Sequence, residues 1–305
     1  MTSKPEKHYP TSFDPRTLAK LQGLALRARH IVEGYVAGLH RSPYRGFSIE
    51  FAEHREYAPG DDLRYVDWKV FGRTDKFYLK QYEDETNLIC YLVLDVSESM
   101  LYRSPGAGLS KLEYAQCLAA AMAWLVLHQQ DAVGLVTFDD QIRTNVPPSS
   151  NASHLRTLLQ VMEDVRPVAK TATGPIFHEL AERFRKRGVV LILSDLFDNV
   201  GSLMAGLKHL SHRRHDVILL HVLDPAELEF PFRNPTMFQG LEQFPELLAD
   251  PRSLRKAYLQ EIERFRTEVQ KGCRRYEMDY RLIRTDQPLD MALSKYLAER
   301  SARVR

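Results

Sequence analysis

The chain has 305 residues, 44% of them hydrophobic and 27% charged, a balance typical of a globular protein with one sizeable core and an appended region. Its 42 Lys and Arg against 40 Asp and Glu give a net charge of +2, so the overall charge gives no reason to expect nucleic acid or a membrane surface as a partner. The three cysteines are widely spaced, which argues against disulfides and a zinc site. The polar start argues against a secretory signal, and no apolar run approaches the roughly 18 residues of a membrane span. We therefore expect a cytoplasmic protein.

The first 85 residues are predicted to form an extension that precedes the main sheet. Apolar residues at helical spacing over 18–36 predict an amphipathic helix. Apolar residues then alternate with polar ones around 47–51 and 77–79, which indicates short antiparallel strands. Between them, Pro59-Gly60-Asp61-Asp62 predicts a turn, because Pro presets φ and Gly accepts a positive φ.

From residue 86 to 305, apolar strands alternate with helices, which predicts a mostly parallel sheet in a second domain. Because right-handed crossovers join parallel strands, helices should cover both faces of this sheet. The predicted strands cover residues 88–94, 132–138, 142–146, 188–194, 216–222 and 279–283. The predicted helices cover residues 111–129, 152–165, 176–187, 200–212, 252–274 and 289–302. The acidic and aromatic segment from Pro225 to Pro251 is predicted to be a long loop, of a length that usually has a function or forms a lid.

The most informative segment is the apolar strand that runs into Asp95-x-Ser97-x-Ser99. It places one carboxylate and two hydroxyls at the carboxyl end of a buried strand, where open α/β sheets bind ligands. Oxygen donors of this kind suit a hard divalent cation such as Mg²⁺ or Mn²⁺. The simpler alternative is that these side chains only cap the following turn and helix.

Two later segments extend this pattern. The strand 188–194 ends in Ser194-Asp195, which puts a second carboxylate at the same edge of the sheet, and the loop Thr171-Ala172-Thr173-Gly174 lies between. The order DxSxS, a Thr in a Gly-bearing loop, and an Asp that closes an apolar strand resembles the metal-ion-dependent adhesion site (MIDAS) of von Willebrand factor A domains. The resemblance covers about residues 86 to 302 and implies a von Willebrand factor A-like, Rossmann-like α/β fold.

More narrowly, the chain resembles the bacterial A-domain-like family DUF58, which is associated with MoxR-type AAA+ ATPases. This resemblance extends over nearly the whole chain and is carried by three segments, FAEHREYAPGDDLRYVDW at 51–68, DVSESM at 95–100 and LDPAELEFPF at 223–232. It implies a metal-dependent protein-interaction module that acts as partner or adaptor of a MoxR-type ATPase or of its client. It implies no enzymatic activity.

For the site, the resemblance implies that the hydroxyls of Ser97, Ser99 and Thr173 are direct ligands of Mg²⁺, while Asp95 and Asp195 act through bound water. Neutral hydroxyl ligands leave the ion short of negative charge and electrophilic toward a partner's carboxylate. The threonine loop departs from the family pattern, since Thr-Ala-Thr-Gly-Pro-Ile stands where Gly-Gly-Thr is expected. Thr171 therefore remains an alternative to Thr173, and a site that neither threonine reaches would be vestigial.

Two other functions remain open. A metal-independent structural adaptor would recognise partners through the polar block 51–68 and the 225–250 loop. Within that block, Arg55 and Arg64 could instead pair with nearby carboxylates and fix the extension. A metal-assisted phosphohydrolase is the least favoured, because Ser97 stands where a haloacid-dehalogenase phosphatase has its second Asp, and the chain has neither a G-x-S-x-G elbow nor a P-loop.

Overall fold

The computed structural model describes most of the chain. The described residues are 15–39, 54–56, 78–80, 88–167, 173–238 and 247–289. The chain divides into a smaller unit of residues 39–87 and a larger unit of residues 1–38 together with 88–305. In the smaller unit, β1 (His54–Glu56) pairs antiparallel with β2 (Tyr78–Lys80). Most of the block 51–68 and the predicted turn at 59–62 lie outside the described residues.

A six-stranded sheet forms the centre of the larger unit, in the order β10-β7-β6-β3-β4-β5. Its strands are β3 (Ile89–Asp95), β4 (Ala132–Phe138), β5 (Ile142–Ser149), β6 (Val189–Ser194), β7 (Asp216–Leu223) and β10 (Asp279–Arg284). Neighbouring strands are parallel except β4 and β5, which are antiparallel. The chain leaves β3 toward β4 and β5 on one side and later resumes with β6 on the other. The carboxyl ends of β3 and β6 therefore flank the topological switch point, where open α/β sheets bind their ligands.

Burial explains why these sequences form strands. The apolar sequence VVLILS of β6 is buried at every position, and ICYLVLD of β3 is buried at all but its first residue. Near-continuous apolar runs of this kind are required of parallel strands that helices cover on both faces. The edge strand β5 instead alternates between half-buried and exposed residues.

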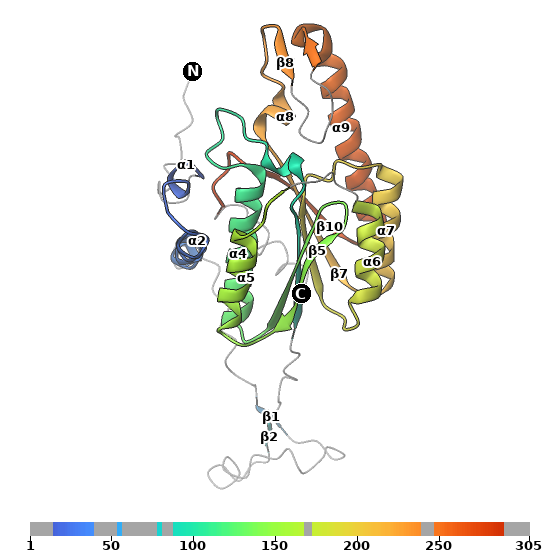
Figure 1. The fold of residues 1–305 in the computed structure, drawn as a ribbon. Helices are drawn as coiled ribbons and strands as arrows, with labels where there is room; N and C mark the ends of the chain where they lie inside the picture. Colours follow the sequence, from blue (N-terminus) through green and yellow to red (C-terminus); the bar gives the residue numbers. More distant parts are fainter. Residues whose placement is uncertain are drawn as a thin grey trace. The chain divides into compact units, whose positions relative to one another are not determined.

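Helices cover both faces of the sheet (Figure 1). On one face lie α4 (Lys111–His128) and α5 (His154–Glu163), and on the other α6 (Thr173–Arg183), α7 (Val200–His212) and α9 (Pro251–Arg275). The predicted fold class, a mostly parallel α/β sheet between two helical layers, is confirmed. None of the helices in the described stretches is long and apolar enough to cross a membrane.

The amino-terminal helix is divided and packs on the larger unit. α1 (Pro15–Leu18) and α2 (Leu24–Leu39) are separated by a short turn in which Gly23 has a φ of +84°. Leu18 and Ile31 are fully buried in the same core as α4, and the backbone N–H of Leu24 donates to Glu163 Oε1 of α5 at 2.6 Å. The sequence predicted one helix within an extension of residues 1–85; the structure differs because the apolar stripe of this helix needs the α4 face to bury it.

The segment predicted as one long loop contains regular secondary structure. It contains α8 (Pro225–Glu229) and an antiparallel pair, β8 (Thr236–Phe238) and β9 (Leu247–Ala249). Asp224 caps α8 and Pro225 stands in its first turn, a combination that starts helices. The prediction of a loop over 225–251 was therefore wrong for these residues. The predicted helix over 289–302 lies, except for Leu289, outside the described residues.

Candidate metal centre

Asp95 is the last residue of β3 and joins the two strands at the switch point. Its side chain is fully buried, and its two oxygens have separate partners. Oδ1 accepts the backbone N–H of Ser97 at 2.9 Å, and Oδ2 accepts the hydroxyl of Ser194, at the end of β6, at 2.5 Å. The carboxylate thus fixes the start of the loop after β3 against the neighbouring strand.

Ser97 and Ser99 lie together in this loop, Ser99 within the short 3₁₀ helix η3 (Glu98–Leu101). Their Oγ atoms are 3.0 Å apart, and the two residues are 0% and 9% exposed. Ser97 precedes η3 but makes no capping hydrogen bond with its side chain; its hydroxyl instead shares a hydrogen bond with the hydroxyl of Ser99. Mg²⁺ binds oxygens at about 2.1 Å in near-octahedral geometry, which sets neighbouring ligand oxygens about 3.0 Å apart. The serine pair fits two adjacent ligand positions of such an ion.

Thr173 is the first residue of α6 and is fully buried. Its hydroxyl donates to Asp198 Oδ2 at 2.8 Å, and the same oxygen accepts the backbone N–H of Gly174 at 3.3 Å. Because the hydroxyl hydrogen points to Asp198, the lone pairs of Thr173 Oγ1 stay available to a cation. Thr171 lies outside the described residues, so both Thr171 and Thr173 remain candidate ligands.

Asp195 follows β6, is fully buried and forms an ion pair. Lys111 Nζ donates to Asp195 Oδ2 at 2.7 Å and to Glu227 Oε1 at 2.6 Å, and the lysine side chain is 0% exposed. Burial lowers the pKa of Lys111, but the two carboxylates outweigh burial and raise it overall, so the ammonium stays charged. Within the described residues, no hydrogen bond joins Thr173 or Asp195 to the serine pair.

The turn after β6 directs two carboxylates to different partners. Leu196 is fully buried with a φ of +59°, in the left-handed region that bulky residues rarely adopt. Ser194 Oγ accepts the N–H of Leu196 at 2.9 Å, and the N–H of Asp198 donates to the carbonyl oxygen of Leu196 at 2.6 Å. Strained conformations of this kind cost about 1–3 kcal/mol and cluster at functional sites. Here the turn sends Asp195 to Lys111 and Asp198 to Thr173.

The electrostatics of the site favour a cation. Burial, and secondarily the negative charge of Asp195, raise the pKa of Asp95 to about 7. The hydrogen bonds from Ser194 and Ser97 act in the opposite direction without offsetting this effect. A positive charge near Asp95 would restore its ionised form.

The donor chemistry limits which cation fits. In the described part of the chain, no three His, Cys, Asp or Glu side chains are arranged to hold a metal ion, so a metal centre here depends on hydroxyl ligands. Hydroxyl and carboxylate oxygens suit Mg²⁺ or Mn²⁺ rather than zinc or copper. The residues present therefore fit the expected ion, with Ser97 and Ser99 as the best-defined candidate ligands.

Three residues of this region were not predicted as parts of the site: Lys111, Asp198 and Glu227. Lys111 begins α4, where a cation faces the positive end of the helix dipole, and this unfavourable position is a signal that a specific acceptor holds it. Asp198 and Glu227 carried no signal of their own, because many Asp and Glu residues follow strands or stand in the first turn of helices.

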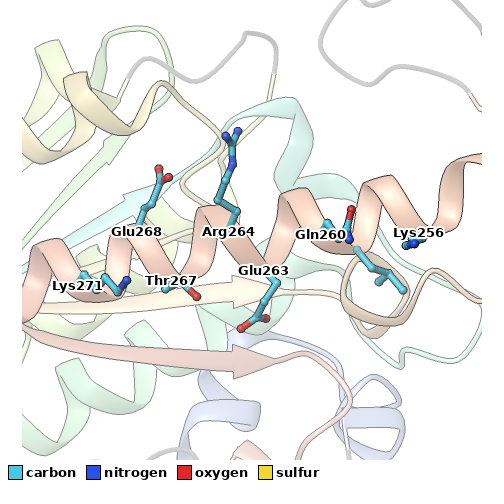
Figure 2. A pocket seen from close by; sticks show the side chains of 8 residues that line it. Lys256, Gln260, Glu263, Arg264, Thr267, Glu268 and Lys271 are labelled. Atoms are coloured by element: carbon cyan, nitrogen blue, oxygen red, sulfur yellow. The ribbon is translucent and has the colours of Figure 1, made fainter.

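A separate hollow runs along the exposed face of α9 (Figure 2). All of its lining residues come from this helix, and most are charged, among them Lys256, Glu263 and Lys271. None of them belongs to the site at the switch point.

The family described as "Protein of unknown function DUF58" matches this chain over residues 53–268. The chain belongs to this family. The match includes the strand β3, the DxSxS loop, Thr173 and Asp195, so the whole candidate site lies within the DUF58 region.

Relatives of this DUF58 protein span nearly all of it. An uncharacterized protein of Mycobacterium tuberculosis, Rv1480, is 27% identical over 292 residues, which is 94% of this chain and 90% of the relative. Among solved structures, the conserved hypothetical protein BatB from Bacteroides thetaiotaomicron has 17% identity and a TM-score of 0.47, and covers 70% of this chain and 99% of its own. The SpRpn10 VWA domain has 13% identity and a TM-score of 0.38, and covers 68% of this chain and 93% of its own.

Proposed function

We propose that this DUF58 protein is a Mg²⁺-dependent protein-interaction module of the MIDAS type. The observation that supports it best is the pair of buried serine hydroxyls, 3.0 Å apart, at the switch point between β3 and β6. The predicted ligands are Ser97, Ser99 and Thr173, with Asp95 and Asp195 as nearby carboxylates that act through water.

The residues of the chain have distinct tasks in this proposal. Asp95 holds the serine loop by accepting the N–H of Ser97, and Ser194 holds Asp95 in turn. Asp198 orients the hydroxyl of Thr173 by accepting its hydrogen bond. Bound Mg²⁺ supplies a coordination position that a carboxylate of a partner protein can occupy.

The proposed partner is a MoxR-type AAA+ ATPase or its client. This part of the proposal rests on the family resemblance of the segments 51–68, 95–100 and 223–232. It also agrees with the absence of a P-loop from the sequence, because nucleotide hydrolysis must then come from another protein.

Isothermal titration of the purified chain with Mg²⁺ and with Mn²⁺ tests the cation site. Ser97→Ala should abolish the binding heat, because it removes one ligand oxygen without adding bulk. The matched control is Ser153→Ala, at an exposed serine before α5, which should bind as the wild type does. Equal binding by the wild type and Ser97→Ala would contradict the proposed ligand set.

A metal-independent adaptor is the second candidate, and one observation favours it. Lys111 already gives the buried carboxylate of Asp195 a counter-charge, so the fold does not need a metal ion to neutralise that residue. Binding to a purified MoxR-type ATPase, measured with Mg²⁺ and with EDTA, separates the two functions. The MIDAS proposal expects the complex to be lost with EDTA and with Ser97→Ala; the adaptor expects neither change.

A further inference from the structure

Lys111 touches two parts of the molecule that are distant in sequence. Its ammonium lies between Asp195 at the end of β6, at 2.7 Å, and Glu227 in α8, at 2.6 Å. The rings of Phe197 and Tyr102 lie 4.9 and 6.0 Å from Nζ, and the lysine itself is fully buried. A buried ammonium shared between two carboxylates must move toward one when its bond to the other weakens.

Glu227 lies in the first turn of α8 and is not a candidate ligand of the cation. Its Oε2 accepts the N–H of Asp224 at 2.8 Å and completes the capping box that starts the helix. Asp224 itself accepts the N–H groups of Ala226, at 2.8 Å, and Ser104, at 3.0 Å. The contact between Lys111 and Glu227 therefore helps to fix the position of α8.

An aromatic cluster joins the end of α8 to β8 and α9. Phe230, in the left-handed conformation at the end of α8, stacks on Phe238 of β8 and lies 4.7 Å from the ring of Tyr258 in α9. Arg255 of α9 donates to the carbonyl oxygen of Phe230. Figure 1 shows α8, β8 and the start of α9 at the end of the sheet where η3 lies.

We propose that Lys111 is a positioning residue that couples the cation site to α8, so that loading of the site with Mg²⁺ and tightening of the contact between Lys111 and Glu227 favour each other. This inference rests on the proposed function of the same site. It adds a route by which Mg²⁺ binding affects α8 and the neighbouring strand β8, in which Met237 is 54% exposed.

The sign of the coupling follows from the shared charge. With Mg²⁺ in the site, Asp195 would also interact with the ion or with its water. Its attraction for Lys111 would then weaken, and the ammonium would move toward Glu227. Conversely, loss of the charge on Glu227 leaves the whole ammonium on Asp195, where it competes with the ion. Because linkage is reciprocal, Mg²⁺ strengthens the contact between Lys111 and Glu227 by the same factor as this contact strengthens Mg²⁺ binding.

Glu227→Gln tests the coupling at a residue that the proposal keeps out of the metal ligands. Gln keeps an amide oxygen that can cap Asp224 N–H, and thermal unfolding checks that the variant folds. In titration calorimetry its Kd for Mg²⁺ should rise about fivefold, the lower end of common coupling factors. The matched control is Glu229→Gln, the same charge change in the same helix, at a residue that contacts Arg284 instead of Lys111. Its Kd should equal that of the wild type.

Hydrogen exchange of the wild type gives a second measurement that needs no variant. The backbone amides of residues 226–230 should exchange about fivefold more slowly with saturating Mg²⁺ than with EDTA. In Glu227→Gln, Mg²⁺ should leave this exchange unchanged.

The outcomes separate the two proposals. If the wild type binds Mg²⁺ but Glu227→Gln binds it equally well, or if exchange at 226–230 ignores Mg²⁺, the coupling is wrong and the cation site stands. If the wild type binds no Mg²⁺, the coupling fails together with the proposed function.

Discussion

The charge state of Asp95 makes the stability of the metal-free protein depend on pH. The pKa of this buried carboxyl is raised to about 7, so its folded-state pKa lies above its unfolded value of 3.8. A group of this kind contributes stability that is fully present below the unfolded pKa and is lost as the pH rises through the folded one. Relative to a variant with a neutral side chain here, the metal-free wild type should lose stability between pH 5 and pH 8.

Asp95→Asn is that variant, because Asn is close in shape to the protonated acid. The measurement is thermal unfolding of both proteins in EDTA from pH 5 to pH 8. The difference in Tm, wild type minus variant, should fall as the pH rises from 5 and should level off once the pH passes the folded-state pKa of about 7. The variant is needed because His221, whose pKa burial lowers to about 3, loses stabilising effect in the opposite direction, as the pH falls below 6.5. A difference that stays constant with pH would show that Asp95 does not titrate there.

Lys111 should matter for stability as well as for coupling. Lys111→Met keeps the length of the side chain but leaves Asp195 and Glu227 buried without a counter-charge. Loss of one partner of a buried ion pair costs about 3–5 kcal/mol, and urea unfolding should show a loss of this size. The double variant Lys111→Met with Glu227→Gln removes one of the two stranded charges and should recover part of it. Lys256→Met, at an exposed position of α9, should unfold like the wild type.

The sequence predicted which sheet edge holds the candidate site, but it predicted side-chain contacts there only between close neighbours in the chain. Asp95, Ser97 and Ser99 stand at alternate positions after an apolar strand, so their convergence follows from local geometry. The bonds from Ser194 to Asp95 and from Lys111 to Asp195 join residues 99 and 84 positions apart, and only the packing of β6 and α4 on β3 brings them together. Sequence periodicity contains no information on such pairs.

At the scale of elements, the contact between α6 and α7 positions Thr173. A Cβ atom on Gly206 of α7 would lie 2.6 Å from the carbonyl oxygen of Gly174 and 2.8 Å from Phe177 Cβ, so the two helices touch through backbone. Gly206→Ala must push α7 from α6, which overpacks the interface at a cost of about 1–3 kcal/mol. Because Gly174 follows Thr173 directly, the same change should weaken Mg²⁺ binding.

Urea unfolding and titration calorimetry of Gly206→Ala measure the two effects. Gly106→Ala is the control, because nothing lies within 4 Å of a Cβ atom built there. It should leave both stability and Mg²⁺ affinity close to those of the wild type. If Gly206→Ala loses stability but binds Mg²⁺ normally, the position of Thr173 does not depend on the helix contact.

Long periodic elements were predictable, whereas short ones were not. The strands of the six-stranded sheet and the helices α4 and α7 lie within a few residues of their predicted bounds, because each repeats one spacing of apolar residues over many positions. α8 has five residues and β8 and β9 three each, too few to show a period. These elements instead depend on a cap at Asp224 and on aromatic contacts between segments, such as Phe230 with Tyr258.

At the scale of the whole molecule, a cation bound only by the folded state must raise its stability. At a Mg²⁺ concentration of about 100 times Kd, the gain is about 2.7 kcal/mol, which corresponds to a rise in Tm of about 5 °C for a chain of this size. The net charge of +2 makes a general screening effect small, so the gain should come from the site alone.

Two controls distinguish site binding from nonspecific salt effects. Ser97→Ala should show no rise in Tm with Mg²⁺, although it lacks only one hydroxyl. Ca²⁺ takes about six to eight oxygen ligands, many of them from carboxylates, whereas Mg²⁺ keeps several of its waters, so a site with few protein ligands, most of them hydroxyls, should favour Mg²⁺ and Mn²⁺ over Ca²⁺. Thermal unfolding with each ion at equal ionic strength measures this order. An equal rise in Tm with all three ions, or an undiminished rise in Ser97→Ala, would mean that the ions act elsewhere on the protein.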